Sequence, residues 1–115
     1  MRVRSTCSDG VVTLSFEGGE ALDAHAAPQV KREALPLIDG TADVVVDLTR
    51  VAFIDSSGLG LLVSLYKAVR RRGRRAVFSS AQPEVRQVMK IIKLDRIFEL
   101  HADVESALRS LRVPA

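Results

Sequence analysis

The chain has 115 residues, which is long enough to bury one hydrophobic core and too short for two ordinary domains, so we expect one domain over residues 1–115. Hydrophobic residues make up 47% and charged residues 27%, which excludes an intrinsically disordered chain. The net charge of +3 is a mild excess, and the aromatic content of 4% argues against recognition of single-stranded nucleic acid through stacking.

The cysteine and hydropathy patterns indicate an environment inside the cell. The single cysteine, Cys7, excludes an internal disulfide and fits a reducing compartment. Because Cys7 lies in the first predicted strand, we expect a small packed residue rather than a reactive thiol. No apolar run approaches the ~20 residues needed to cross a bilayer, and no apolar signal-peptide region follows Met1. We therefore expect a cytoplasmic protein with no membrane partner.

The first third of the chain predicts a β-hairpin followed by a helix. Residues 3–8 and 11–17 are strand-like, and the Asp-Gly pair between them tolerates positive φ and is a strong hairpin signal. A Gly-Gly pair ends the second strand, and we expect a loop next, in which Asp23 caps the following element. Residues 24–38 have the apolar spacing of a helix, and Pro36 predicts that this helix kinks or ends there.

The middle of the chain predicts a buried strand and a long helix. Residues 43–48 contain three consecutive valines, a β-branched run that is typical of a strand buried on both faces. From residue 57 to residue 72 the apolar residues recur at i, i+3, i+4 and i+7, which indicates a helix, and Gly73 is well placed to end it. Residues 76–78 predict a short buried strand.

The last third of the chain predicts two more helices with a brief strand between them. A helix begins at Pro83 and buries a stripe that reaches Ile92, residues 97–100 form the strand, and Asp103 caps the final helix. The predicted order is β-β-α-β-α-β-α-β-α. It implies an α/β fold with a mixed, mostly parallel sheet, right-handed crossovers and helices packed against the sheet.

The sequence contains few groups of residues with the spacing of a catalytic or metal-binding site. His25 and His101 have no metal-like spacing to carboxylates or to Cys7, and no Walker-type phosphate loop is present. A triad of Ser56, His101 and Asp47 can be assembled on paper, but the segment lacks the Gly-x-Ser-x-Gly elbow that exposes a nucleophile. We therefore expect no catalytic residue, no metal and no cofactor.

A basic run has three interpretations. Cations at the end of a helix complement its dipole and keep the surface solvated; they can bind nucleic acid; or they can attract an acidic protein partner. No nucleic-acid-binding motif or interleaved aromatic residue supports the second, so we expect no direct nucleic-acid contact. The run consists of Lys67, Arg70, Arg71, Arg72, Arg74 and Arg75.

The chain is organised around residues 51–60, which read VAFIDSSGLG. An apolar run stops at Asp55 and two serines just before the long helix, where free N–H groups and the helix dipole favour anions. The segment is explained either as a helix cap, carried by Asp55 or Ser57, or as a recognition or modification site. Gly58 and Gly60 are poor helix formers, and their presence suggests that another backbone or protein surface comes very close.

This segment resembles the STAS family, specifically the bacterial anti-sigma factor antagonists. The resemblance covers nearly the whole chain, and the Asp-Ser-Ser-Gly-Leu-Gly core is its most specific part. The matching segments are Val44–Leu48, Val51, Phe53–Gly60, the helix ending at Arg70–Gly73, the helix beginning at Pro83–Val85, and Leu94–Leu100.

The resemblance implies a partner-switching protein that is not an enzyme. In this family the serine directly after the aspartate, here Ser56, is phosphorylated by an ATP-binding anti-sigma factor that is a serine kinase. The unmodified protein binds that kinase and frees its client, and a serine phosphatase restores the unmodified form. Two other STAS roles remain open: a scaffold in a larger signalling assembly, and a subunit of a lipid-transport ABC complex.

The resemblance also places further residues near the phosphorylation site, on the surface that binds the partner. Leu22-Asp23 matches the family pattern, although the loop before it, Gly18–Ala21, is longer than in many relatives. The residues expected around Ser56 are Asp23, Asp55, Ser57, Gly58, Leu59 and Gly60.

Overall fold

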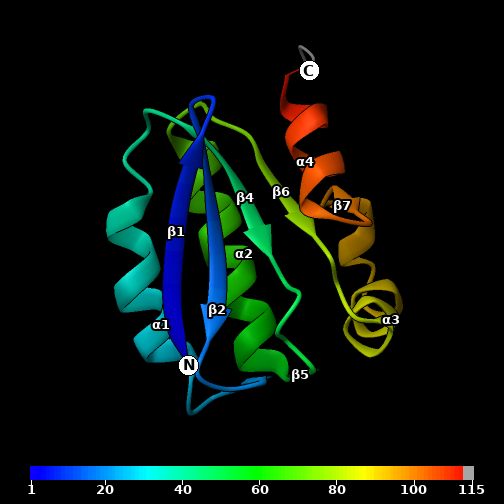
Figure 1. Cartoon of the computed structure of the whole chain (residues 1–115). Coiled ribbons are helices and arrows are strands. Elements are labelled where there is room, and N and C mark those ends of the chain that lie inside the picture. The colour runs from blue at the N-terminus through cyan, green and yellow to red at the C-terminus, as the bar shows by residue number, and fades with distance from the viewer. Residues whose placement is uncertain (113–115) are drawn as a thin grey trace.

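The computed structural model describes residues 1–112 (Figure 1). This part of the chain contains seven strands and four helices. The strands are β1 (Arg2–Ser8), β2 (Val11–Glu17), β3 (Ala21–Leu22), β4 (Asp43–Asp47), β5 (Phe53–Ile54), β6 (Ala76–Ser79) and β7 (Leu100–His101). The helices are α1 (Ala27–Ala34), α2 (Ser56–Arg71), α3 (Pro83–Ile91) and α4 (Val104–Leu111), with 3-10 turns η1 (Leu35–Leu37) and η2 (Leu94–Arg96).

The main sheet has the strand order β1-β2-β4-β6-β7 and is mixed, as the sequence predicts. The hairpin of β1 and β2 is antiparallel, and its turn residues Asp9 and Gly10 have φ angles of 52° and 74°, which the Asp-Gly pair accepts at low cost. All other neighbouring strands in this sheet are parallel. The α/β fold class predicted from the sequence is confirmed.

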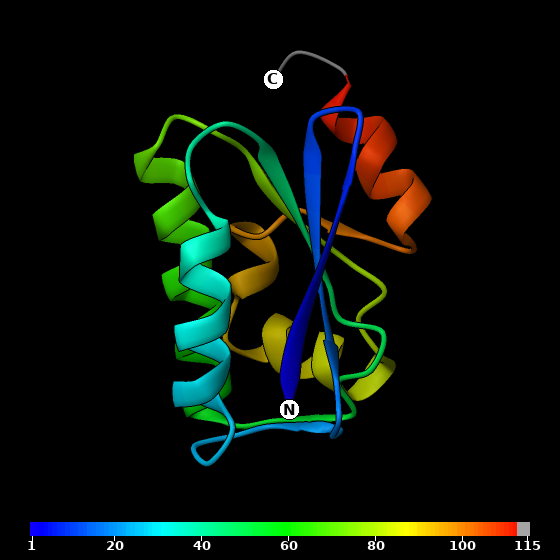
Figure 2. The same cartoon turned by 60° about the vertical axis from the view of Figure 1, so that its left-hand side comes forward.

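Helices cover both faces of the sheet, which explains the continuous apolar run in β4. Val44 and Val46 point into the core that α1, α2 and α3 close. Val45 points the other way, into a smaller cluster with Ala107 of α4. Figure 2 shows α1 and α2 on one side of the sheet and α4 on the other. Each of the three valines is at most 1% exposed, so β4 is buried on both faces as predicted.

The first helix is shorter than its apolar spacing predicts. It starts at Ala27 rather than at residue 24, because residues 23–26 form a turn. It ends at Ala34, and Pro36 lies in the 3-10 turn that follows. The expected end near Pro36 is confirmed, since a proline ring lacks the N–H that an α-helix needs at that place.

The strand predicted at residues 97–100 is wrong in position. Helix α3 ends at Ile91, and Lys93 in the left-handed conformation (φ 65°) turns the chain into η2. The strand that joins the sheet begins only at Leu100. Phe98 is 2% exposed and stacks on Phe78 at a centroid distance of 4.2 Å, so its side chain holds this part of the segment. Backbone bonding to β6 starts at the next residue, where the carbonyl of Glu99 accepts a hydrogen bond from the N–H of Phe78 (2.9 Å).

Two side chains expected to be packed are exposed. Cys7 lies on β1, an edge strand of the sheet, and is exposed. Ile92 follows α3 and is 48% exposed, so the buried stripe of that helix stops at Met89. In both places the residue type favours burial, but within residues 1–112 the side chain is left exposed. Among residues 1–112, none of the helices has the length and apolarity needed to cross a bilayer.

Candidate functional site

The site rests on a small second sheet that the sequence did not reveal. The loop expected at residues 20–23 contains β3, which pairs in parallel with β5 so that Leu22 lies opposite Ile54. The carbonyl of Glu20 accepts hydrogen bonds from the N–H groups of Ala52 (2.8 Å) and Phe53 (3.2 Å), and the carbonyl of Leu22 accepts one from Asp55 (3.4 Å). This register brings the residues that follow the two strands together.

Asp55 is the cap of α2 and also connects α2 to the start of α1. Its Oδ1 accepts a hydrogen bond from the N–H of Gly58 (2.9 Å), and its Oδ2 accepts one from the N–H of Ala24 (3.0 Å). These N–H groups, that of Gly58 first, hold the pKa of Asp55 below its usual value, so the side chain is ionised at neutral pH. The predicted capping role of Asp55 is confirmed.

Asp23 follows β3 as Asp55 follows β5, so the pairing of these strands brings the two residues close together. Asp23 accepts hydrogen bonds from N–H groups at the start of α1, as Asp55 does at the start of α2. Its Oδ1 accepts hydrogen bonds from the N–H groups of Ala26 (2.9 Å) and His25 (3.1 Å). Its carbonyl accepts one from Ala27 (2.8 Å), the first residue of α1. The expectation that Asp23 lies near Ser56 is therefore supported by the pairing of β3 with β5. In Figure 2 both α1 and α2 begin at the lower end of the molecule.

Ser56 and Ser57 are the first two residues of α2, and both are exposed. Because Asp55 carries the cap, neither hydroxyl is needed to satisfy the end of the helix. Ser57 lines a hollow between α1 and α2, whereas Ser56 is not among the residues lining it. Both hydroxyls are therefore free to meet another protein, and they face different surroundings.

The three residues after the serines serve different purposes. A Cβ atom on Gly58 would overlap with the carbonyl oxygen of Leu22 and lie 2.8 Å from Cγ1 of Ile54. The close backbone that the sequence predicted is thus the chain's own β3, and Gly58 is buried. Leu59 is 9% exposed and belongs to the core. Gly60 is exposed, and a Cβ there would meet nothing within 4 Å, so of these three residues it is Gly60 that borders open space.

Phe53 is a residue of this surface that the sequence reasoning passed over. It precedes Asp55 by two positions and is 56% exposed, whereas its neighbour Ile54 is 6% exposed. A hollow of about 90 Å³ beside it is lined by Val85 and Val88 of α3. The alternation of side chains along an extended segment was the available signal, because it predicts that Phe53 and Ile54 point in opposite directions.

The catalytic alternative finds no support in the geometry. His101 contacts the carboxylate of Glu99 (2.9 Å), and Asp47 accepts hydrogen bonds from the N–H (3.1 Å) and the hydroxyl (2.6 Å) of Thr49. Over residues 1–112, no hydrogen bond joins Ser56, His101 and Asp47 to one another. The same part of the chain contains no group of three or more potential metal ligands.

The chain is similar to proteins of one known family. The STAS domain family matches residues 2–107. The chain belongs to the STAS domain family. Two similar curated proteins are anti-sigma-B factor antagonists: one from Listeria monocytogenes is 36% identical over 74% of this chain and 75% of its own length, and one from Staphylococcus aureus is 29% identical over 91% and 96%.

Solved structures confirm the STAS fold. An anti-sigma-factor antagonist (STAS) domain protein from Planctomyces limnophilus superposes with a TM-score of 0.87 at 24% identity, covering 98% of this chain and 100% of the other. The anti-sigma factor antagonist SpoIIAA in its unphosphorylated form gives 0.77 at 23% identity and 98% of both chains. Bacillus SpoIIAA in its phosphorylated form gives 0.69 at 22% identity, over 94% and 97%.

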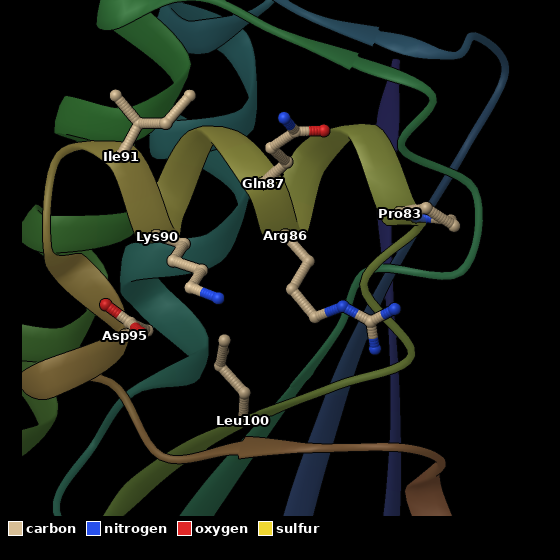
Figure 3. A pocket seen from close by; sticks show the side chains of 7 residues that line it. All are labelled: Pro83, Arg86, Gln87, Lys90, Ile91, Asp95 and Leu100. Carbon is tan, nitrogen blue, oxygen red and sulfur yellow. The ribbon is translucent and has the colours of Figure 1, made fainter.

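Another hollow of this STAS domain lies away from the serines. It has a volume of about 650 Å³ and is lined by residues of α3, η2 and β7 (Figure 3). None of the site residues expected from the sequence lines it. Its lining residues are Pro83, Arg86, Gln87, Lys90, Ile91, Asp95 and Leu100.

Half of the basic run serves the STAS fold itself. Arg72 donates to the carbonyl of Asp39 (3.3 Å), and Arg74 donates to the carbonyl of Thr41 (3.3 Å). Arg75 donates to the carbonyl of Ser110 (3.2 Å). The solvated-face interpretation is therefore incomplete for these three arginines, because they also connect the end of α2 to the loop before β4 and to α4. Arg72 is nevertheless exposed, and Arg74 and Arg75 are partly buried. Lys67, Arg70 and Arg71 remain exposed.

Proposed function

We propose that this STAS protein is a cytoplasmic anti-sigma factor antagonist that works by partner switching. The unmodified form binds a cognate anti-sigma factor, which is an ATP-binding serine kinase, and so frees the client of that kinase. Phosphorylation of Ser56 ends the interaction, and a serine phosphatase restores it. The role is regulatory, and the protein acts as the substrate of the kinase. The names of the curated relatives, anti-sigma-B factor antagonists, support the partner class.

The observation that carries the proposal is the exposed Ser56 at the first position of α2. It directly follows Asp55, whose two carboxylate oxygens already accept backbone hydrogen bonds. Because Asp55 accepts the hydrogen bonds of the Gly58 and Ala24 N–H groups, a phosphate on Ser56 replaces no existing helix cap. The N-terminus of a helix tolerates an added negative charge. Phosphorylation is therefore compatible with an intact fold, and the switch need not unfold the domain.

The same phosphate obstructs a partner for a local electrostatic reason. It adds about −1.5 to −2 charges beside Asp55, whose lowered pKa keeps it ionised, and close to Asp23. A protein surface that docks against this end of the molecule has to remove the phosphate from water, and that costs more than removing a hydroxyl. We therefore propose that phosphorylation blocks binding at the interface itself.

Mass spectrometry tests the site. The protein is incubated with ATP and a candidate serine-kinase anti-sigma factor from the same organism, and the peptide carrying residues 55–57 is sequenced. We expect one phosphate, on Ser56. The Ser57→Ala variant is the matched control, because it removes the neighbouring exposed hydroxyl and should be modified like the wild type. Phosphate on Ser57, or none at all, contradicts the proposal.

Calorimetry tests the switch. Ser56→Asp should weaken binding to the kinase at least about tenfold, which corresponds to about 1.4 kcal/mol, and Ser56→Ala should bind like the wild type. Equal affinities for the wild type and Ser56→Asp contradict the proposed block.

Co-purification separates the two other STAS roles: membrane permease subunits indicate a lipid-transport complex, and a large assembly without a kinase indicates a scaffold.

A further inference from the structure

A continuous groove runs along α1 and α2 and begins at the serine end of α2. Its first part has a volume of about 510 Å³ and its second part about 340 Å³. Both parts are lined by Lys31 and Ser64, so the two meet there. Figure 2 shows the two helices side by side along this length. We name this feature the α1–α2 groove; its lining residues are Ala24, Ala27, Pro28, Lys31, Leu35, Ser57, Gly60, Leu61, Ser64, Lys67, Ala68 and Arg71.

The charges along the groove have one sign. Lys31, Lys67 and Arg71 line it, and none of its other lining residues is charged. All three cations are exposed. Within residues 1–112, none of the ion pairs involves any of the three, whereas Arg74 and Arg75 of the same basic run are paired with Asp43 and Glu99. The groove therefore holds three cations without an internal counter-charge.

The remainder of the lining is small or apolar. Ala27 and Leu61 are buried, and Leu35 and Ala68 are partly buried. Gly60 leaves the groove open, because nothing lies within 4 Å of where its Cβ would be. An apolar floor with positive side chains above it suits a segment that has apolar and acidic side chains on neighbouring faces.

We infer that the α1–α2 groove docks an acidic amphipathic segment of a partner protein. This rests on the proposed function in one respect: the partner that carries the segment is the serine-kinase anti-sigma factor. A nucleic acid fits less well, since aromatic stacking residues are missing from the lining and the floor is apolar. A membrane surface fits less well, because the cations line a concave feature rather than surround a protruding apolar face.

With an acidic segment in the groove, phosphorylation at one point affects a long interface. Ser57, the neighbour of Ser56, lines the groove at the end where α2 begins. A phosphate at that end introduces negative charge where an acidic segment enters, so the two repel each other. The three cations attract the segment in the unmodified protein, and like-charge repulsion opposes it in the modified protein.

The first test uses a probe that does not depend on the kinase. The probe is a helical peptide of glutamate, leucine and alanine about as long as α2, which has 16 residues, and binding is followed by amide chemical shifts of the isotope-labelled protein. We expect shifts along the groove, at Lys31, Gly60 and Ser64, with an affinity that falls as salt is added. Shifts centred on the hollow of Figure 3 overturn the inference.

Charge reversal supplies the matched comparison. The triple variant K31E/K67E/R71E should weaken peptide binding by about tenfold or more, because three attractions become repulsions. The control triple R86E/K90E/R96E reverses three exposed cations on α3 and η2 and should change affinity less than about twofold. Equal weakening by both variants overturns the inference, as does tighter binding of a DNA duplex or of phosphatidylglycerol vesicles through the same groove residues.

The kinase then separates this inference from the proposed function. If the kinase binds the wild type and Ser56→Asp weakens that binding, we expect the groove triple to weaken it about tenfold as well. Unchanged kinase binding by the groove triple overturns the docking site and leaves the proposed function standing. Failure of the wild type to bind the kinase overturns the proposed partner, and the peptide measurement then decides about the groove by itself.

Discussion

The clearest test of the site's architecture is the substitution Gly58→Ala. Alanine is normally the better residue inside a helix, by about 1 kcal/mol. At this position, however, the added methyl group would overlap with the backbone carbonyl of Leu22 and lie 2.8 Å from Cγ1 of Ile54. The overlap involves backbone on one side, so a rotation of a flexible side chain cannot relieve it. The start of α2 has to move away from β3.

The expected magnitude follows from opposing terms. Overpacking of a well-packed site typically costs about 1–3 kcal/mol, and the upper end applies where backbone has to shift. The better helix propensity offsets about 1 kcal/mol of this cost. We therefore expect a net loss of about 2 kcal/mol in the free energy of unfolding, and a decrease of about 10 °C in the melting temperature.

Thermal and urea unfolding, followed by circular dichroism, measure this effect. Gly60→Ala is the control, since it adds the same methyl group to the same helix where nothing lies within 4 Å. It should raise the stability by up to about 1 kcal/mol. If Gly58→Ala stabilises the protein as Gly60→Ala does, the close approach of α2 to β3 is refuted, and with it the account of how Asp55 is held in place.

Two further predictions concern carboxylates that accept backbone hydrogen bonds. The N–H of Val3 (2.9 Å) is the main cause that lowers the pKa of Glu33 to about 2, so Glu33 stabilises the folded state above its ordinary pKa and loses this effect as the pH falls toward 2. Glu33→Gln should therefore melt below the wild type at pH 7, with a difference that disappears near pH 2; a constant difference would contradict this. Asp55→Ala should lower the melting temperature at neutral pH and reduce phosphorylation of Ser56, because it removes the bonds to Gly58 and Ala24. Unchanged melting and phosphorylation would show that this cap is dispensable.

Local chemistry in the sequence determined the order and type of most elements. The Asp-Gly turn, the β-branched run of β4, the apolar spacing of α2 and the glycine after it each depend on residues close together in the chain. For the same reason the sequence narrowed the cap of α2 to Asp55 or Ser57, whereas the role of Ser56 came from the family resemblance. A cap bonds to N–H groups only three residues away, so its identity is a local property.

Tertiary structure alone decided what these residues touch across the fold. The pairing of β3 with β5 joins segments about thirty residues apart and involves two residues on each side, too few to leave a pattern. The strand expected at residues 97–100 was misplaced because Phe98 is held by stacking on Phe78, a contact that periodicity cannot predict.

The two glycines of the Asp-Ser-Ser-Gly-Leu-Gly motif show most directly what the sequence predicts and what only the tertiary structure decides. In the sequence Gly58 and Gly60 are equivalent signs of a close neighbour. In the fold Gly58 meets the backbone of β3, while Gly60 borders the open α1–α2 groove. The sequence determined where α2 begins and, through its resemblance to the STAS family, which site we expect to be modified. Only the packing of α1 beside α2 decided that three cations of this chain line one groove beginning at that site, since burial and contact depend on segments that are distant in the chain.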